Sequence, residues 1–313
     1  MKIACIFPGQ GSQYPGMGKD LVENFPVSLQ VFEEVDDALG FSMSRLCFEG
    51  DAEELQLTEN TQPAILTVSV AAYRALEANG FPTPVFVAGH SLGEYSALVA
   101  ARTLDLSDAV KTVRARGRYM QEAVPVGVGA MAAVMGAELS AIEKVCEEVR
   151  GEEVCSPANI NSPNQVVIAG HATAIDRAME RLKEVGAKRV VKLNVSAPFH
   201  CELMKPAQDR LAKDLEQLTF SIAKTPVVTN VDAKVTNDPV TLRDSLIRQV
   251  SSPVRWLESM RLLINQGVET FVEVGPGKVL AGLMRQINRE VNCLNVEDAS
   301  GLRAMVTKVT AHS

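Results

Sequence analysis

The sequence lacks most features that mark specialised classes of protein. Aromatic residues make up only 5% of its 313 residues, and no apolar run approaches the roughly 18 residues of a membrane-spanning helix. The apolar run behind Lys2 ends at Pro8-Gly9, which is too short for a secretion signal. We therefore expect a cytoplasmic protein with no membrane partner.

Metal-binding and disulfide patterns are also missing. The six cysteines form no CxxC pair and show no metal-ligand spacing, and there are only four histidines. Such scattered cysteines are typical of reduced thiols. The sequence therefore predicts no disulfide framework and no metal.

Acidic residues outnumber basic ones, which gives a formal net charge of −7. A protein that binds a phosphate backbone carries a concentrated basic face, so nucleic acid is not an expected partner. One stretch does gather positive charge: Lys183, Lys188, Arg189 and Lys192. We interpret this stretch as a solvated helix end and strand. The alternative is that these residues form a local basic patch.

What is present is the composition of an ordinary globular protein, with 46% hydrophobic and 22% charged residues. Short buried strands at Ile3 to Phe7 and Val85 to Ala88 alternate with helical patterns, such as the one from Pro63 to Asn79. This alternation is typical of an α/β domain with a parallel sheet.

The order of elements changes after residue 126. From Met131 to Val195 the pattern predicts strand, helix, strand, strand, helix, strand, which is the βαββαβ order of a ferredoxin-like unit. After Pro198 the earlier alternation resumes. We therefore predict a large α/β domain over residues 1–126 and 198–313, interrupted by a ferredoxin-like subdomain over residues 127–197.

The strongest chemical signal is a serine between two glycines, Gly89-x-Ser91-x-Gly93, which follows a buried strand and precedes a helical pattern. Small neighbours permit the strained turn of a nucleophile elbow, which projects the serine hydroxyl from the sheet as in α/β-hydrolase-like domains. The amide of Leu92 is then placed to donate to a developing oxyanion. We expect Ser91 to carry an acyl group as a covalent ester, although a merely structural turn would show the same spacing.

A serine hydroxyl needs a base, and the four histidines can be compared one by one. His90 is adjacent to Ser91 and should point away from it, His171 ends a strand of the small unit, and His312 is near the C-terminus. His200, where the chain re-enters the large domain, remains as the general base. No acid near it stands out as a triad member, so we expect a backbone carbonyl to hold the ring.

Arg116 is the most informative charge, because it shares a predicted helix face with the apolar Val113 and Met120. A charge on the core side of a helix needs an anionic partner, since an unpaired buried charge is too costly. That partner is either an internal carboxylate or the carboxylate of a substrate, gripped in a bidentate fork. Helix geometry alone does not decide between the two.

The glycine-rich loop that begins at Gly9 follows the first strand, as the glycine-rich loop of a nucleotide-binding site does. The nucleotide-binding interpretation fails, because Tyr14 stands where the third glycine of a dinucleotide fingerprint belongs. A loop at this sheet edge instead supplies a second oxyanion donor, for which the amide of Gln10 is the candidate.

Taken in order, these motifs resemble the malonyl-CoA:acyl carrier protein transacylase family, and in particular the discrete bacterial enzymes of fatty acid synthesis. The resemblance covers almost the whole chain and rests on Gly9-Gln10-Gly11-Ser12-Gln13, Gly89-His90-Ser91-Leu92-Gly93-Glu94, Arg116-Gly117, Asn161-Ser162-Pro163, Phe199-His200 and Glu273-Val274-Gly275-Pro276-Gly277. One departure is Asn164, where a glycine is expected; it lies in a turn of the small unit, away from the chemistry.

The resemblance implies a ping-pong transfer of the malonyl group from malonyl-CoA, through an ester on Ser91, to the phosphopantetheine thiol of acyl carrier protein. His200 would act as base and then acid, the amides of Gln10 and Leu92 would form the oxyanion hole, and Arg116 would bind the free malonyl carboxylate. No cofactor or metal is implied, and we expect a monomer.

Three further residues take roles only through the resemblance. The main-chain carbonyl of Gln249 would orient the histidine, Gln62 would line the site, and Phe199 would restrict room for a branch at the acyl α-carbon. Because acyl carrier proteins are acidic, the basic stretch around Lys188 and Arg189 is expected to contribute to docking.

Two other functions use the same motifs. In a serine hydrolase, water rather than a thiol would attack the ester on Ser91. The lack of a triad acid and the position of Arg116 on a core-facing helix side disfavour this function. A non-catalytic module that binds carrier protein would need neither a nucleophile nor a base, yet both are present.

Overall fold

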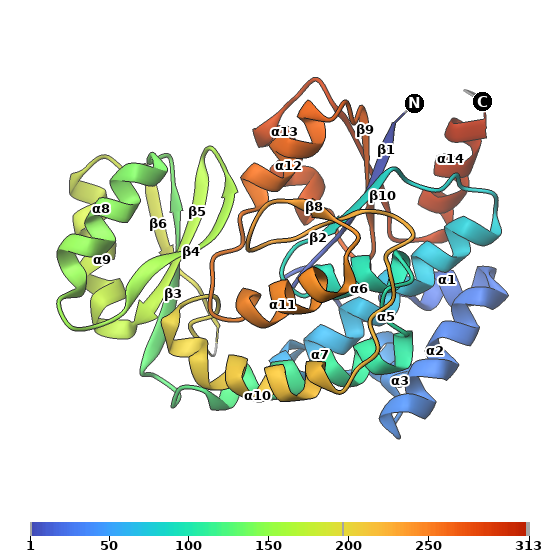
Figure 1. Ribbon diagram of the computed structural model, residues 1–313, viewed down its shortest axis with the longest axis horizontal. Coiled ribbons are helices and arrows are strands. Elements are labelled where there is room, and N and C mark those ends of the chain that lie inside the picture. The colour runs from blue at the N-terminus through green and yellow to red at the C-terminus, as the bar shows by residue number, and fades with distance from the viewer. Residues whose placement is uncertain (1, 196, 311–313) are drawn as a thin grey trace.

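The computed structural model describes residues 2–195 and 197–310, and it contains two β-sheets with helices packed around them (Figure 1). The strand order is β10-β9-β1-β2-β7-β8 in the larger sheet and β4-β5-β3-β6 in the smaller one. The protein is therefore a mixed α/β protein. The strands are β1 (Ile3–Phe7), β2 (Phe86–Gly89), β7 (Val227–Val228), β8 (Val235–Thr236), β9 (Thr270–Val274) and β10 (Asn292–Val296) in the larger sheet, and β3 (Gly129–Met135), β4 (Cys155–Ser162), β5 (Gln165–His171) and β6 (Arg189–Lys192) in the smaller.

The larger sheet is parallel except at one edge. Strand β1 pairs in parallel with β2 and β9, β9 with β10, and β2 with β7, whereas β8 runs antiparallel to β7. This edge strand was not predicted from the sequence. Only residues 229–234 join β7 to β8, and a parallel connection needs a crossover of about a dozen residues, so the chain turns back on itself.

Helices cover both faces of the larger sheet because its strands are apolar on both sides. Successive side chains of a strand point to opposite faces. In β1, Cys5 and Phe7 join the main hydrophobic core, whereas Ala4 and Ile6 join a second cluster that includes Trp256 and neighbouring helical residues. All five residues of β1 are buried. A near-continuous apolar run is what a strand covered on both faces requires.

The helix predicted from Pro63 to Asn79 is present beside the larger sheet, where several further helices were not predicted from the sequence. The long buried helix α5 (Thr58–Ala78) contacts α6 (Gly93–Ala100) and α7 (Leu106–Glu122), and α6 lies against β1 and β2. The remaining helices are α1 (Lys19–Asn24), α2 (Pro26–Leu39), α3 (Met43–Glu49), α4 (Ala52–Gln56), α10 (Lys205–Glu216), α11 (Pro239–Gln249), α12 (Trp256–Asn265), α13 (Val279–Ile287) and α14 (Ala299–Thr310), with a short 3₁₀ turn at Glu202–Met204.

The smaller sheet is antiparallel and lies to one side of the larger one, with α8 (Leu139–Arg150) and α9 (Ala172–Glu184) packed on it (Figure 1). Along β3, Ala132 and Val134 belong to the core beneath these helices, whereas Met131 and Ala133 belong to the main core of the protein. Helices α8 and α9 therefore cover one face of the small sheet, and the other face packs against the main core. Within the described residues, no helix combines the length and the apolar character that a membrane crossing requires.

Candidate active site

The Ser91 turn joins β2 directly to α6 and depends on the two glycines that flank it. Ser91 has a φ of 52°, in the left-handed region that costs energy for any residue with a side chain. A Cβ atom at Gly93 would lie 2.1 Å from the carbonyl oxygen of Phe7, and one at Gly89 would lie 1.9 Å from the backbone of Gly93. Only glycine fits either position, so the GxSxG spacing is imposed by backbone packing.

His200 lies directly against Ser91. Its Nε2 is 2.7 Å from Ser91 Oγ, and its Nδ1 is 2.9 Å from the main-chain oxygen of Gln249. Since a carbonyl oxygen only accepts, Nδ1 carries the proton and Nε2 is left to accept one from the serine. His200, like Ser91, has a positive φ, 60°, at the point where the chain returns from the small sheet.

The environment of His200 keeps the ring neutral. Burial, followed by the positive charge of Arg116, lowers the pKa of His200 to about 3 from its ordinary value of 6.5. A neutral imidazole at physiological pH has a free lone pair on Nε2. The ring is therefore in the protonation state that a general base requires.

Arg116 is fully inside the protein, with 2% of its surface exposed, and no carboxylate among the described residues pairs with it. Its Nη1 donates to Oε1 of Gln62 at 2.6 Å, and its Nη2 donates to Oε1 of Gln249 at 2.8 Å and to Ser91 Oγ at 3.2 Å. Its Nε has no hydrogen-bond partner within the described chain. The guanidinium is therefore held beside the serine by neutral amides rather than by an anion.

The neighbouring arginines point elsewhere. Arg114 stacks on the ring of Phe41 at 4.3 Å, and Arg118 lies over the ring of Tyr119 at 5.5 Å. Only Arg116, on the buried face of α7, reaches Ser91.

Two amides at the turn remain available for a ligand. Ser91 N donates to Oδ1 of Asn230 at 2.7 Å, whereas the amides of Leu92 and Gln10 donate to no other described atom of the chain. Both residues line the same cleft as Ser91. The loop that carries Gln10 is pressed against the turn, because a Cβ atom at Gly9 would lie 2.5 Å from the oxygen of His90.

The cleft has a volume of about 210 Å³ and is lined by both sheets' elements. The larger part contributes Gln62, Phe199 and the α13 residue Leu280, and the small sheet contributes Met131 and Val167. Ser91, Arg116 and His200 lie on its wall. The structure thus brings every site residue predicted from the sequence to one place, Gln249 through its contacts with His200 and Arg116.

The other histidines lie away from the serine hydroxyl. Nε2 of His90 is 2.8 Å from Oδ1 of Asn161, which ties the turn to β4 of the small sheet. Nδ1 of His171 accepts from the amide of Val154 at the end of β5. His312 lies outside the described residues.

Two buried polar residues of the site were missed by the sequence analysis. Asn230 binds the turn through Ser91 N and also donates from Nδ2 to the oxygen of Gly89 at 2.7 Å. Oε2 of Glu94 accepts from the amide of Asn230 at 3.1 Å and from Nε2 of Gln249 at 2.7 Å. Glu94 directly follows the GxSxG motif, so its position was visible in the sequence, but the partners of Glu94 and Asn230 were not.

The cysteines and acidic residues were also compared with the patterns of disulfide and metal sites. All six cysteines are unbridged. No group of three or more His, Cys, Asp or Glu side chains that could hold a metal ion occurs in residues 2–195 and 197–310.

A serine on a strained turn, paired with a neutral histidine and adjacent to two free amides, defines an enzyme of the acyl-serine class. A family model described as acyl transferase domain matches residues 4–307. A curated relative, the malonyl CoA-acyl carrier protein transacylase of Bacillus subtilis, is 50% identical over 298 residues, which cover 95% of this chain and 94% of that one.

Solved structures agree with these matches. The malonyl CoA-acyl carrier protein transacylase of Coxiella burnetii superposes with a TM-score of 0.97 at 44% identity, over 99% of this chain and 98% of that one. A malonyl-transacylase solved in complex with a type II PKS acyl-carrier protein superposes with a TM-score of 0.96 at 45% identity, over 98% of this chain and 100% of that one. The chain belongs to the acyl transferase family, among the malonyl CoA-acyl carrier protein transacylases.

Proposed function

We propose that the protein transfers a malonyl group from malonyl-CoA to the phosphopantetheine thiol of acyl carrier protein, supplying malonyl-acyl carrier protein for fatty acid synthesis. The observation that carries this proposal is the buried Arg116, which forms no ion pair with any carboxylate of the described residues and whose Nη2 lies 3.2 Å from Ser91 Oγ. A substrate with a free carboxylate would supply the missing anion.

In the acylation step, Nε2 of His200 takes the proton of Ser91 as Oγ attacks the thioester carbonyl of malonyl-CoA. The amides of Gln10 and Leu92 stabilise the oxyanion that forms. The tetrahedral intermediate collapses, the carbon–sulfur bond breaks, and His200 returns its proton to the departing CoA thiol. Malonyl-Ser91 remains.

In the second step the acceptor takes the place of CoA. His200 removes the proton from the phosphopantetheine thiol, whose sulfur attacks the ester carbonyl of malonyl-Ser91. Collapse of the second intermediate breaks the carbon–oxygen bond and returns the proton to Ser91 Oγ. Both substrates carry the same pantetheine arm, so one cleft serves both steps.

Selectivity follows from the walls of the cleft. Arg116, held by Gln62 at 2.6 Å, would grip the malonyl carboxylate and disfavour uncharged acyl groups. Phe199, which lies beside His200, would restrict space for a branch at the α-carbon. Gln249 would contribute twice, since its carbonyl oxygen orients His200 and its side chain holds Arg116.

We also propose the partner surface and the domain plan. Lys188 and Arg189 are exposed, whereas Lys183 and Lys192 are already paired with acids, so the first two are the residues free to meet an acidic carrier protein. The element order of residues 129–192 supports a ferredoxin-like subdomain over 127–197. The parallel strands and the Ser91 turn support a hydrolase-like domain over 1–126 and 198–313.

The remaining proposals are that the enzyme needs no cofactor or metal, acts in the cytoplasm and works as a monomer. The chemistry above is complete with side chains, amides and the two thiols alone, which supports the first of these.

The decisive experiment is incubation of the purified protein with malonyl-CoA, without carrier protein, followed by mass spectrometry of the peptide that contains Ser91. A malonyl adduct that is absent from Ser91→Ala, and that acetyl-CoA does not form, is the expected result. Rapid release of CoA without an adduct would mean that water accepts the acyl group and that the protein is a hydrolase. Binding of carrier protein without any acyl-serine would indicate a non-catalytic module.

A further inference from the structure

Asn230 lies behind the Ser91 turn and bonds to both of its sides. Oδ1 accepts from Ser91 N, and Nδ2 donates to the oxygen of Gly89, each at 2.7 Å. Asn230 is 1% exposed, and it is not among the residues that line the cleft. It therefore holds the strained backbone of the turn without touching the space that a substrate would occupy.

Asn230 is itself fixed by the residues around it. Its amide donates to Oε2 of Glu94 at 3.1 Å, and its carbonyl accepts from the amide of Arg255 at 3.0 Å. The same Oε2 accepts from Nε2 of Gln249, which also donates to the oxygen of Ser91 at 3.0 Å. Three buried polar side chains, those of Asn230, Glu94 and Gln249, thus form one network beneath the serine.

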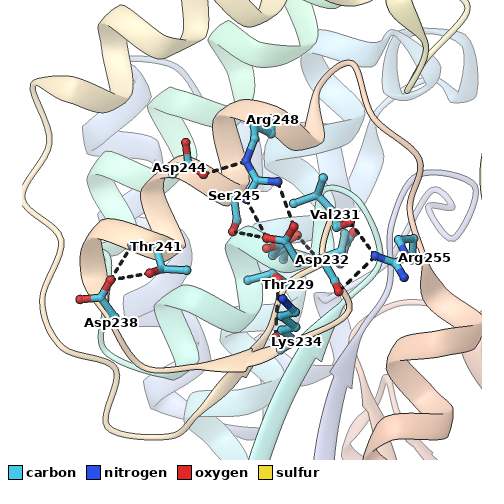
Figure 2. A network of polar contacts seen from close by, with 12 residues as sticks. Thr229, Val231, Asp232, Lys234, Asp238, Thr241, Asp244, Ser245, Arg248 and Arg255 are labelled. Carbon is cyan, nitrogen blue, oxygen red and sulfur yellow. Dashed lines mark hydrogen bonds and ion pairs between the residues drawn. The ribbon is translucent and has the colours of Figure 1, made fainter.

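An ion-pair cluster at the surface ties together the two segments that carry this network (Figure 2). Arg248, one residue before Gln249, donates from Nη1 and Nη2 to the two oxygens of Asp232, at 3.0 and 2.7 Å. Asp232 lies two residues after Asn230, and Nη1 of Arg255 donates to its carbonyl at 3.2 Å. The cluster joins the end of α11 to the β7–β8 turn.

We propose that Asn230 is a positioning residue for acyl transfer, and that the Asp232–Arg248 pair holds it in place relative to Gln249. Asn230 fixes the Ser91 turn so that Oγ stays on His200. By occupying Ser91 N, it also leaves the neighbouring Leu92 amide as the donor at this turn. This inference rests on the function proposed above for Ser91.

The first test is Asn230→Ala, measured as the single-turnover rate of malonyl-Ser91 formation over a range of malonyl-CoA concentrations. Because small displacements of reacting groups cost up to about 100-fold in rate, we expect the maximal rate constant to fall by about 30- to 100-fold. The malonyl-CoA concentration at half-maximal rate should change by less than about threefold, since Arg116 keeps its contacts. Ser28→Ala, a buried serine that bonds the oxygen of Ala71, is the matched control and should retain the wild-type rate.

A second series tests the surface pair without disturbing the buried network. Arg248→Met should lower the same rate constant by about three- to tenfold, and Arg248→Lys, which keeps one donor, should recover part of the loss. Arg243→Met, on the same helix and outside the Asp232 cluster, should have no effect. If Asn230→Ala does not fold, this series decides the question.

The inference is overturned if Arg248→Met matches Arg243→Met, or if Asn230→Ala changes only the half-maximal concentration or the fraction of active enzyme. Active-site titration by the burst of CoA separates a slower site from fewer sites. Failure of the wild-type protein to form malonyl-Ser91 would instead overturn the proposed function itself.

Discussion

The main-chain oxygen of Gln249 lies 2.9 Å from Nδ1 of His200, in the place where many serine enzymes have a carboxylate. The backbone therefore orients the ring without adding negative charge to the site. As a result, the charge of Arg116, 3.2 Å from Ser91 Oγ, is not neutralised from this side. The arrangement suits an acyl group that brings its own carboxylate.

Replacement of Arg116 should change which acyl group is accepted. We expect Arg116→Gln to lower kcat/KM for malonyl-CoA by about 100-fold, equal to about 2.7 kcal/mol, because a charged hydrogen-bonded pair is lost. The rate with acetyl-CoA should change far less, so the ratio of the two substrates is the quantity to measure. Arg114→Gln, on the same helix but stacked on Phe41, is the control. Equal losses in both variants would remove Arg116 from substrate binding.

Protonation of His200 should not slow acylation between pH 5 and pH 8. Because the pKa of His200 is lowered to about 3, the ring stays neutral throughout this range. A histidine of ordinary pKa 6.5 would instead lose about 20-fold between pH 7 and pH 5. Rapid-quench measurement of malonyl-enzyme formation distinguishes the two profiles.

The same shift predicts a direction for stability. An unfolded chain binds a proton at this histidine below pH 6.5, whereas the folded protein does not until pH falls to about 3. The free energy of unfolding should therefore decrease as pH drops through this window. His200→Gln should weaken this pH dependence, and an unchanged slope in urea unfolding would contradict the assignment.

Glu94→Gln should stabilise the protein more at pH 8 than at pH 5. Burial raises the pKa of Glu94 to about 7, so its carboxylate form is disfavoured in the folded state as pH rises from 4.5 through 7. Among the described residues, two donors bond Oε2 of Glu94 and none bonds Oε1, so a glutamine can place its amide nitrogen at the Oε1 position. We expect a gain of about 1–3 kcal/mol at pH 8, with little change at pH 5.

Thermal unfolding of both proteins at the two pH values checks this prediction. A larger gain at pH 5 would show that Glu94 is ionised at low cost, and that the Coulombic attraction of Arg116 outweighs burial.

Two glycine substitutions should have opposite signs. A Cβ atom at Gly93 would lie 2.1 Å from the oxygen of Phe7, so Gly93→Ala should destabilise the protein by more than about 2 kcal/mol and abolish acylation. Gly282 lies in helix α13 with no heavy atom near the position of a Cβ. Gly282→Ala should therefore stabilise the protein by about 0.5–1 kcal/mol. Urea unfolding measures both, and similar losses would mean that the elbow has no special steric requirement.

Charge reversal at Lys188 and Arg189 should weaken use of the carrier protein alone. We expect Lys188→Glu with Arg189→Glu to raise the KM for acyl carrier protein by about tenfold at low salt and less at high salt, because the attraction is screened. Formation of malonyl-Ser91 should stay unchanged. Lys19→Glu with Arg45→Glu makes the same change in net charge on exposed positions of α1 and α3, two helices that lie on the opposite side of the molecule from β6 (Figure 1). Equal effects on both half-reactions would exclude this surface.

The residues that the sequence could identify are those with local signals. Ser91 lies in a five-residue motif between two elements, Arg116 breaks the apolar face of a helix, and His200 remained after three other histidines were compared. The first two signals depend on a few neighbours in the chain, and the third depends on how few histidines the chain has. The strands predicted at Ile3 to Phe7 and Val85 to Ala88 likewise match β1 and β2 to within one residue, because apolar patterning is local.

Other features could not be predicted because their partners are distant in the chain. The contacts of Asn230 with Ser91 and of Glu94 with Asn230 span more than a hundred residues. Helices α12, α13 and α14 and strand β10 were not predicted, although α13 contributes to the wall of the cleft. The antiparallel edge strand β8 is only two residues long and pairs with an equally short β7, too short for a period to register.

The sequence by itself determined the chemical type of this protein. Short segments are enough to recognise a GxSxG turn, a histidine and an arginine on a buried helix face. Only the tertiary structure shows that Arg116 forms no ion pair with a carboxylate of the described residues. Whether a buried charge is matched depends on which oxygens surround it, and these come from α5 and α11, far from Arg116 in the chain. The fold places two neutral amides on the guanidinium, which supports the proposal that the substrate brings the carboxylate.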